Sequence, residues 1–220
     1  MHTIRWNMNG QEIERESFSI IDAECAALRQ SLPDDQWRVA RRLIHTTADA
    51  SIAAALRYRN NALPSGRAAL QRGCRIICDA KMIRSGISLE KLRRVNPAYS
   101  AEHVLCAISD ADVIARAKAE NRTRALCAAE KLRPVLDGAV ILIGNAPLAL
   151  ARIVRYTLEE SVQPALLIAM PVGFVNVLEA KALLAQSPVP HIVLEGRRGG
   201  STLAVATLHA VLETTPLAQA

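Results

Sequence analysis

The chain has 220 residues, of which 50% are hydrophobic and only 3% aromatic, and its formal net charge is +6. This much apolar material supports a sizeable core of aliphatic and alanine side chains, and because no linker divides the chain we expect one domain over residues 1–220. The basic balance indicates an anionic partner. Nucleic acid is disfavoured, because the basic residues are dispersed and few aromatic side chains are present to stack on bases.

The cysteines and the apolar stretches indicate the cellular location of the protein. Five cysteines, an odd number, show no metal-ligand spacing, which favours reduced thiols in a cytoplasmic protein without a metal. The N-terminus lacks the apolar core of a signal peptide. The longest apolar stretch, residues 140–154, is interrupted by Gly144, Pro147 and Arg152, so we expect no membrane span.

Helical spacing dominates the first third of the chain. Residues 1–15 are polar and are predicted to form a loosely held arm. A helix is expected from about Ser17 until Pro33 stops it, and Asp34 is a candidate N-cap for the next helix, which carries His45. Further helices are expected over residues 49–56 and 67–72, with a turn at residues 64–66 between them.

From residue 75 onward, short apolar runs alternate with helical patterns. The runs lack strict alternation, as expected for strands that are covered on both faces. The predicted strands are residues 75–79, 103–108, 139–143, 165–170 and 192–194, and the predicted helices are 89–95, 111–132, 148–159, 176–185 and 203–212. This order predicts an α/β fold: a three-layer α/β/α domain with a five-stranded parallel sheet and the N-terminal helices packed against it.

Glycine-bearing turns follow several of these strands. They are Gly144-Asn145, residues 171–176 and the run Gly196-Arg197-Arg198-Gly199-Gly200-Ser201. Ligands of parallel sheets bind at the carboxyl ends of the strands, where turn amides and helix N-termini attract anions. We therefore expect a carboxylate or phosphate to bind at this edge. The alternative is that glycine and proline only form tight turns, and no nucleotide-binding motif is present.

A second candidate feature is the segment from Arg42 to Asp49. At helical spacing Arg42, His45 and Asp49 fall on one face, where Arg42 would disfavour and Asp49 would favour the protonated imidazole. Such a histidine suits acid–base chemistry. The alternative is a solvated histidine on an arginine-rich helix.

A set of short motifs in fixed order resembles a known family. These motifs are Ser17-Phe18, Arg42 with Ile44-His45, Asp79-Ala80, Thr123-Arg124, Gly144-Asn145-Ala146-Pro147, Pro171-Val172-Gly173-Phe174-Val175, Glu179 with Lys181, and Gly196 to Ser201. From about residue 17 to residue 212 the chain resembles the precorrin-8X methylmutases of cobalamin biosynthesis, which include the cobalt-precorrin-8 enzymes.

The resemblance implies a homodimeric isomerase that needs no cofactor or metal. The family moves a methyl group from C-11 to C-12 of its corrin precursor, giving hydrogenobyrinic acid or, with cobalt, cobyrinic acid. By position, His45 matches the proton-transferring histidine, Ser17 and Arg42 match substrate-binding positions, and Arg124 matches an arginine near the substrate. The glycine-bearing turns add the other expected substrate-binding residues, Gly144, Asn145, Arg197, Arg198 and Ser201, and Phe174, Val175 and Met82 are candidates for an apolar floor.

Four positions depart from the usual family pattern. Leu148, Ala180 and Ala125 replace a threonine and two serines, and His209 stands where asparagine is common. These departures keep open the alternative of a corrinoid-binding paralogue without activity. A separate alternative is an unrelated α/β protein that binds a phosphorylated metabolite at residues 196–201.

Overall fold

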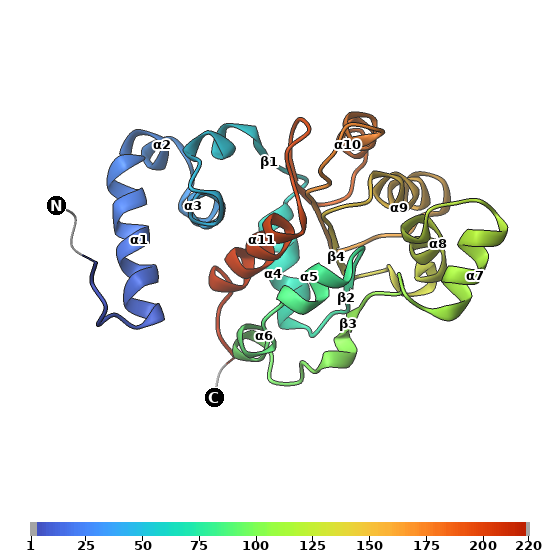
Figure 1. Cartoon of the computed structure of the whole chain (residues 1–220), viewed down its shortest axis with the longest axis horizontal. Coiled ribbons are helices and arrows are strands. Elements are labelled where there is room, and N and C mark those ends of the chain that lie inside the picture. Colours follow the sequence, from blue (N-terminus) through green and yellow to red (C-terminus); the bar gives the residue numbers. More distant parts are fainter. Residues whose placement is uncertain (1–3, 219–220) are drawn as a thin grey trace.

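The computed structural model describes residues 4–218 and consists of one mixed sheet with helices on both faces (Figure 1). The strand order is β1-β6-β5-β4-β2-β3. The strands are β1 (Leu56–Arg59), β2 (Ile76–Cys78), β3 (Val104–Leu105), β4 (Val140–Ile143), β5 (Leu166–Ala169) and β6 (His191–Leu194). All five predicted strands are present and parallel, so the α/β class is confirmed.

The α-helices are α1 (Gly10–Glu24), α2 (Ala26–Ser31), α3 (Asp34–Thr47), α4 (Ala62–Gln71), α5 (Lys81–Gly86), α6 (Leu89–Val95), α7 (Ala111–Ala119), α8 (Arg124–Lys131), α9 (Pro147–Glu160), α10 (Val177–Ala185) and α11 (Ser201–Glu213). Three short 3-10 helices, η1 (Ala50–Ala55), η2 (Ala101–His103) and η3 (Arg133–Val135), connect them. Within residues 4–218, none of these helices combines the length and apolar character that crossing a membrane requires.

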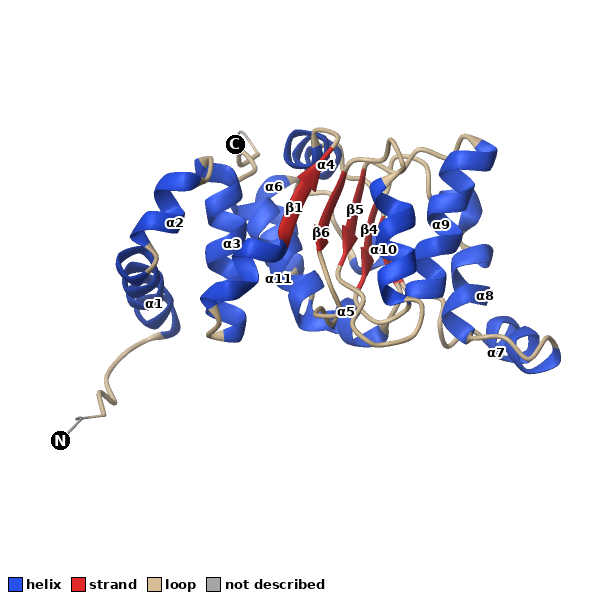
Figure 2. Cartoon of the chain, turned by 90° about the horizontal axis from the view of Figure 1, so that it is seen from above, coloured by secondary structure: helices blue, strands red, loops and turns tan. Residues whose placement is uncertain are grey.

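Successive residues of the buried strands point to opposite faces and enter two separate cores. Val140 and Leu142 pack with α3, α4, α5, α6 and α11, whereas Ile141 and Ile143 pack with α8, α9 and α10. The residues of β4, β5 and β6 are all buried. Burial on both faces explains why these strands appear in the sequence as uninterrupted apolar runs. Figure 2 shows the parallel strands between these helical layers.

The sheet has six strands and not five, because β1 adds to it antiparallel to β6. The helix predicted over residues 49–56 is instead the 3-10 helix η1, after which β1 begins at Leu56. Tyr58 and Arg59 pair with Ile192 and His191 across the ladder. The strand is a short edge strand with two arginines, a pattern that lacks the apolar run of a central strand.

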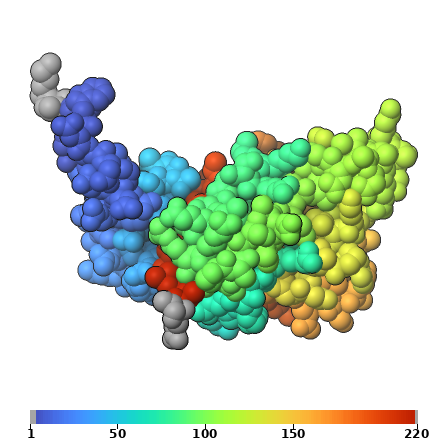
Figure 3. All heavy atoms as spheres, turned by 90° about the horizontal axis from the view of Figure 1, so that it is seen from below, coloured from blue at the N-terminus to red at the C-terminus, as the bar shows by residue number. Residues whose placement is uncertain are grey.

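The predicted N-terminal arm is too long. Positions 1–3 of it lie outside the described residues, and α1 already begins at Gly10, with Asn9 and Glu12 forming a capping box. None of the residues of α1 is buried, and the helix stands at one end of the molecule as the blue lobe of Figure 3. It is attached to α3 through Asp22, which accepts hydrogen bonds from Trp37 and Arg41, each at 2.8 Å.

Two further helical predictions differ from the structure. The predicted turn at residues 64–66 lies inside α4, where Pro64 occupies the first turn and therefore interrupts no hydrogen bond. The single helix predicted over residues 111–132 is two helices, because Asn121 adopts a left-handed φ of 48° after α7 and Thr123 caps the start of α8. At α3, Pro33 and not Asp34 is the N-cap residue.

Candidate active site

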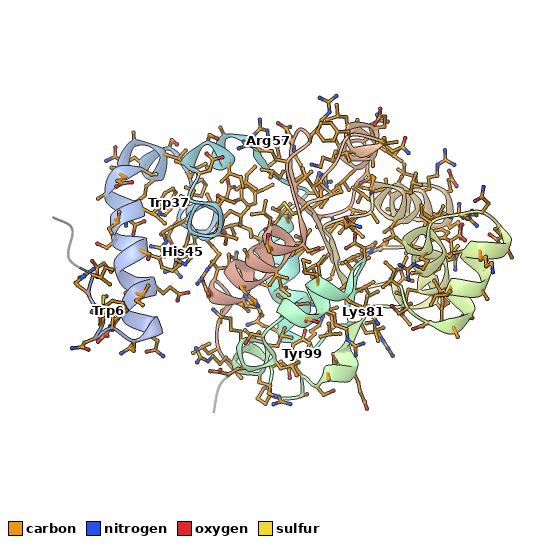
Figure 4. All side chains as sticks on the ribbon, in the orientation of Figure 1. Trp6, Trp37, His45, Arg57, Lys81 and Tyr99 are labelled. Carbon is orange, nitrogen blue, oxygen red and sulfur yellow. The ribbon has the colours of Figure 1, made fainter. Side chains whose placement is uncertain are left out.

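Helix α3 presents His45 close to its carboxyl end. Leu43 and Ile44 are buried on the core side of the helix, which leaves His45 on the side that faces α1. The imidazole contacts the ring of Phe18 edge-on, with the ring centroids 5.3 Å apart. His45 is half-buried, and Figure 4 shows it at α3 beside α1. The preceding residue of α1, Ser17, donates its hydroxyl to the carbonyl oxygen of Ile13 in its own helix at 2.7 Å, so the hydroxyl oxygen remains available as an acceptor.

Arg42 lies one turn before His45 and is bound by two carboxylates. Its Nη1 donates to Glu14 of α1 and its Nη2 donates to Glu213 of α11, both at 2.5 Å. Burial lowers the pKa of Arg42, but these two ion pairs outweigh it, so the pKa is raised and the charge is permanent. The sequence does not indicate Glu14 and Glu213 as partners of Arg42, because they lie 28 and 171 residues away along the chain.

Asp49 lies beyond the end of α3, because Ala48 adopts a left-handed conformation with a φ of 52° and ends the helix. The expectation that Asp49 shares a helical face with His45 is therefore wrong. The carboxylate of Asp49 accepts hydrogen bonds from the Ser51 N–H at 2.9 Å and from Arg198 at 2.7 Å. Hydrogen bonds from Ser51 lower the pKa of Asp49, with Arg198 adding to the effect. Because Arg198 belongs to the loop after β6, this contact places the end of α3 at the carboxyl edge of the sheet.

At that edge the turn after β4 is organised by Asp79, which follows β2. The buried carboxylate of Asp79 accepts hydrogen bonds from the N–H groups of Gly144, Asn145 and Ala146 at 3.0, 2.8 and 2.7 Å. Burial raises the pKa of Asp79 despite these donors. The amides that we expected to bind a ligand at this turn are therefore occupied by the protein itself.

Gly144 and Ser201 are brought into contact by this arrangement. A methyl group at Gly144 would come within 2.7 Å of the Ser201 Cα atom, so glycine is needed for α11 to begin against the end of β4. The side chain of Asn145 is exposed at the same edge.

The loop from Gly196 to Gly200 carries the two predicted arginines. Lys181, a buried residue of α10, donates its ammonium to the carbonyl oxygens of Gly196 and Arg198. Arg197 lies over the ring of Phe174, 5.6 Å from the centroid. In the sequence Lys181 stands out only as part of a motif with Glu179, and nothing there indicates that its side chain is buried.

Large apolar side chains are exposed beside this loop and beside the turn after β2. Phe174, Val175 and Met82 are exposed by 85%, 75% and 67%. These are the three side chains that the sequence offered as an apolar floor, and each is accessible to a ligand.

Arg124 is not brought near His45 within one chain. It is an exposed residue at the start of α8, and α3 and α8 lie at opposite ends of the molecule (Figure 1). Close to it, α8, α9 and α10 line a basic groove, in which Arg116, Arg122 and Arg152 surround the carboxylate of Glu130. Leu148 and Ala180, two of the positions that depart from the family pattern, also line this groove.

Metal-binding side chains do not gather in the described part of the chain: no three His, Cys, Asp or Glu side chains lie together as ligands there.

Comparison with known proteins gives a consistent result. A family model described as precorrin-8X methylmutase matches residues 12–214. The chain is 41% identical to a cobalt-precorrin-8 methylmutase of Leptospira interrogans over 211 residues, covering 92% of this chain and 93% of that protein. It is 39% identical to a precorrin-8X methylmutase of Pseudomonas aeruginosa over 205 residues, covering 92% and 95%. A crystal structure of precorrin-8X methylmutase from Thermus thermophilus is similar, with a TM-score of 0.83 and 44% identity over 93% of this chain and 95% of that one.

Proposed function

Because the chain belongs to the precorrin-8X methylmutase family, we propose that it is an isomerase of cobalamin biosynthesis. It moves the methyl group of precorrin-8X from C-11 to C-12 to give hydrogenobyrinic acid. The cobalt-containing precursor gives cobyrinic acid in the same way, and the relatives in the Leptospira and Pseudomonas species are named for the two forms. An unrelated α/β protein that binds a phosphorylated metabolite is no longer a candidate.

The observation that carries the proposal is the position of His45. It lies near the carboxyl end of α3, against Phe18. Asp49, just beyond the end of this helix, forms an ion pair with Arg198 that ties this part of the chain to the carboxyl edge of the sheet. The methyl shift is intramolecular and needs no external nucleophile. His45 lends one proton to the macrocycle while the methyl group migrates, and recovers it afterwards.

Around His45, basic and polar groups suit a substrate with many carboxylates. Ser17 lies on the same side as His45, and Arg197, Arg198, Asn145 and Ser201 lie at the sheet edge. Arg42 is also on the side of His45, and it binds a substrate carboxylate by exchanging its ion pair with Glu14 or Glu213. Gly144 contributes by allowing the close approach of α11. Phe174, Val175 and Met82 provide an apolar surface for the ring.

We further propose that the enzyme is a homodimer and that Arg124 enters the site from the second subunit. Within one chain α3 and α8 lie on opposite sides of the sheet. In an antiparallel, side-by-side pair related by a two-fold axis, α8 of one copy lies beside α3 of the other. The five free cysteines support a cytoplasmic location, and the few aromatic residues argue against a nucleic-acid partner.

Replacement of His45 tests the proton-transfer role. For His45→Ala acting on precorrin-8X we expect kcat to fall by roughly 10²–10⁴-fold with a nearly unchanged KM, because only the proton transfer is lost. The measurement is the initial rate at which the visible absorption of hydrogenobyrinic acid appears. His103→Asn, a change at another half-buried histidine, is the control and retains the wild-type rate.

Other results would contradict parts of the proposal. A wild-type kcat in His45→Ala refutes the role of His45. Tight binding of hydrogenobyrinic acid by the wild-type protein, without turnover of either precursor, instead supports the alternative of a non-catalytic corrinoid-binding paralogue.

A further inference from the structure

Lys181 is a buried cation without an acidic partner. Its residue is 6% exposed, and its Nζ atom donates to the carbonyl oxygens of Gly196 at 2.7 Å and Arg198 at 2.9 Å. Among residues 4–218, no carboxylate oxygen lies within 4.0 Å of this ammonium group. Burial lowers the pKa of Lys181 to about 8. Burying a charge against carbonyl groups alone is unfavourable, so its position requires a reason other than stability.

We find this reason in the loop of residues 196–200, whose carbonyl oxygens Lys181 binds. The carbonyl of Arg197, between the two that Lys181 binds, accepts a hydrogen bond from the Gly173 N–H at 3.2 Å. Three consecutive carbonyls, those of residues 196, 197 and 198, are thus turned towards α10 and the loop before it. No cis peptide bond is present in the described chain, and in a trans peptide the N–H points opposite to the preceding carbonyl.

The N–H groups of Arg197 and Gly199 therefore point away from the Lys181 ammonium, and the N–H of Arg198 points away from Gly173. Within the described residues these three N–H groups donate to no protein acceptor. These amides, the Arg197 guanidinium and the start of α11 at Ser201 together offer hydrogen-bond donors and positive charge to an anion.

Contacts with two neighbouring segments hold the residues of this loop in place. The Gly200 N–H donates to the Met170 carbonyl at 2.8 Å, and a methyl group at Gly199 would lie 2.2 Å from that same oxygen. Arg198 is held by Asp49 and Ser51, so the loop is connected to the helix that carries His45.

We propose that Lys181 is a positioning residue: by holding the carbonyls of Gly196 and Arg198, it aims the amides of residues 197–199 and the Arg197 side chain at one carboxylate of the substrate. The identity of that ligand rests on the proposed function, whereas the orientation of the loop does not. Lys181 itself does not touch the substrate.

Kinetics of Lys181→Met test the proposal, with Lys118→Met, a change at an exposed lysine of α7, as the matched control. We expect the KM for precorrin-8X to rise about tenfold in Lys181→Met with kcat within about twofold, because a binding contact is lost and the proton transfer is not. Lys118→Met leaves both constants unchanged. Arg197→Ala should cost less in the Lys181→Met background than in the wild type, because a misaligned loop no longer presents Arg197.

A KM within twofold of wild type in Lys181→Met, or full additivity with Arg197→Ala, overturns the proposal. Lys181→Gln, whose side-chain NH₂ group can still donate hydrogen bonds, is the milder variant if Lys181→Met does not fold, and an intermediate KM is expected. A crystal structure of either variant gives an answer even if the wild-type protein turns over no corrinoid. At least one of the peptides 196–197 and 198–199 should be reversed, and an unchanged loop refutes the positioning role.

Discussion

His209 stands in α11 at the position where asparagine is common in the family pattern. Its Nε2 atom accepts a hydrogen bond from the Ser88 N–H at 3.1 Å, which requires this nitrogen to be unprotonated. Burial is the main cause that lowers the pKa of His209 to about 4, and the charges of Lys91 and Arg42 act in the same direction. Glu213 and Glu14 oppose the shift without cancelling it.

This predicts an acid-sensitive stability. An unfolded histidine binds a proton near pH 6.5, whereas folded His209 stays neutral down to about pH 4, so stability is complete above pH 6.5 and declines as pH falls below it. Relative to His209→Asn, the wild-type chain should lose about 2 kcal/mol between pH 7.5 and pH 5. Urea unfolding at the two pH values measures this difference. Equal losses in both proteins would show that His209 does not remain neutral.

Single residues also show which contacts can be predicted from the sequence and which cannot. The spacing of Arg42 and His45 could be read directly from the helical period, because both lie on one local element. The ion pairs of Arg42 with Glu14 and Glu213 could not be predicted from the sequence, since both contacts form only when α1 and α11 pack on α3. The same holds for Asp79, whose three hydrogen bonds to the turn after β4 depend on the pairing of β2 with β4.

At the scale of elements, the junction of β4 with α11 depends on Gly144. In Gly144→Ala the new methyl group meets backbone atoms of Ser201 at 2.7 and 2.9 Å, which cannot move without displacing α11. We expect a loss of about 1–3 kcal/mol in the free energy of unfolding, measured with urea. Gly10→Ala is the control, because nothing lies within 4 Å of its new methyl group. Identical unfolding midpoints for the two variants would contradict the close packing.

Elements were predictable from the sequence where their burial was uniform. The central strands β4, β5 and β6 are buried on both faces and stand out as apolar runs. Strand β1 does not, because Arg57 and Arg59 break its apolar pattern and its partner, β6, lies more than a hundred residues further along the chain. The break between α7 and α8 did leave a signal, the left-handed Asn121 followed by the capping Thr123.

At the scale of the whole molecule, the distance between α3 and α8 leads to a test of the proposed dimer. If Arg124 enters the site of the other subunit, each site contains His45 from one subunit and Arg124 from its partner. A dimer of one His45→Ala subunit and one Arg124→Ala subunit then has one site with both residues intact. Mixing and reassociating two such inactive variants should restore about a quarter of the wild-type activity, because half of the dimers are mixed and each has one intact site. The rate of hydrogenobyrinic acid formation reports the recovery, and self-mixed samples of each variant are the controls.

No recovery in samples where sedimentation confirms mixed dimers would place both residues in the same subunit's site. A monomer in sedimentation would contradict the dimer itself.

The two borders of the sheet restrict how copies of this chain can associate. One border is β1, four residues long with Arg57 and Arg59, and the other is β3, with only two residues. Short or charged borders give an incoming strand few main-chain groups to pair with. In the proposed dimer we therefore expect the subunits to join through helices and loops, and overproduction of the protein should yield little of the cross-strand aggregation that longer, uncharged borders promote.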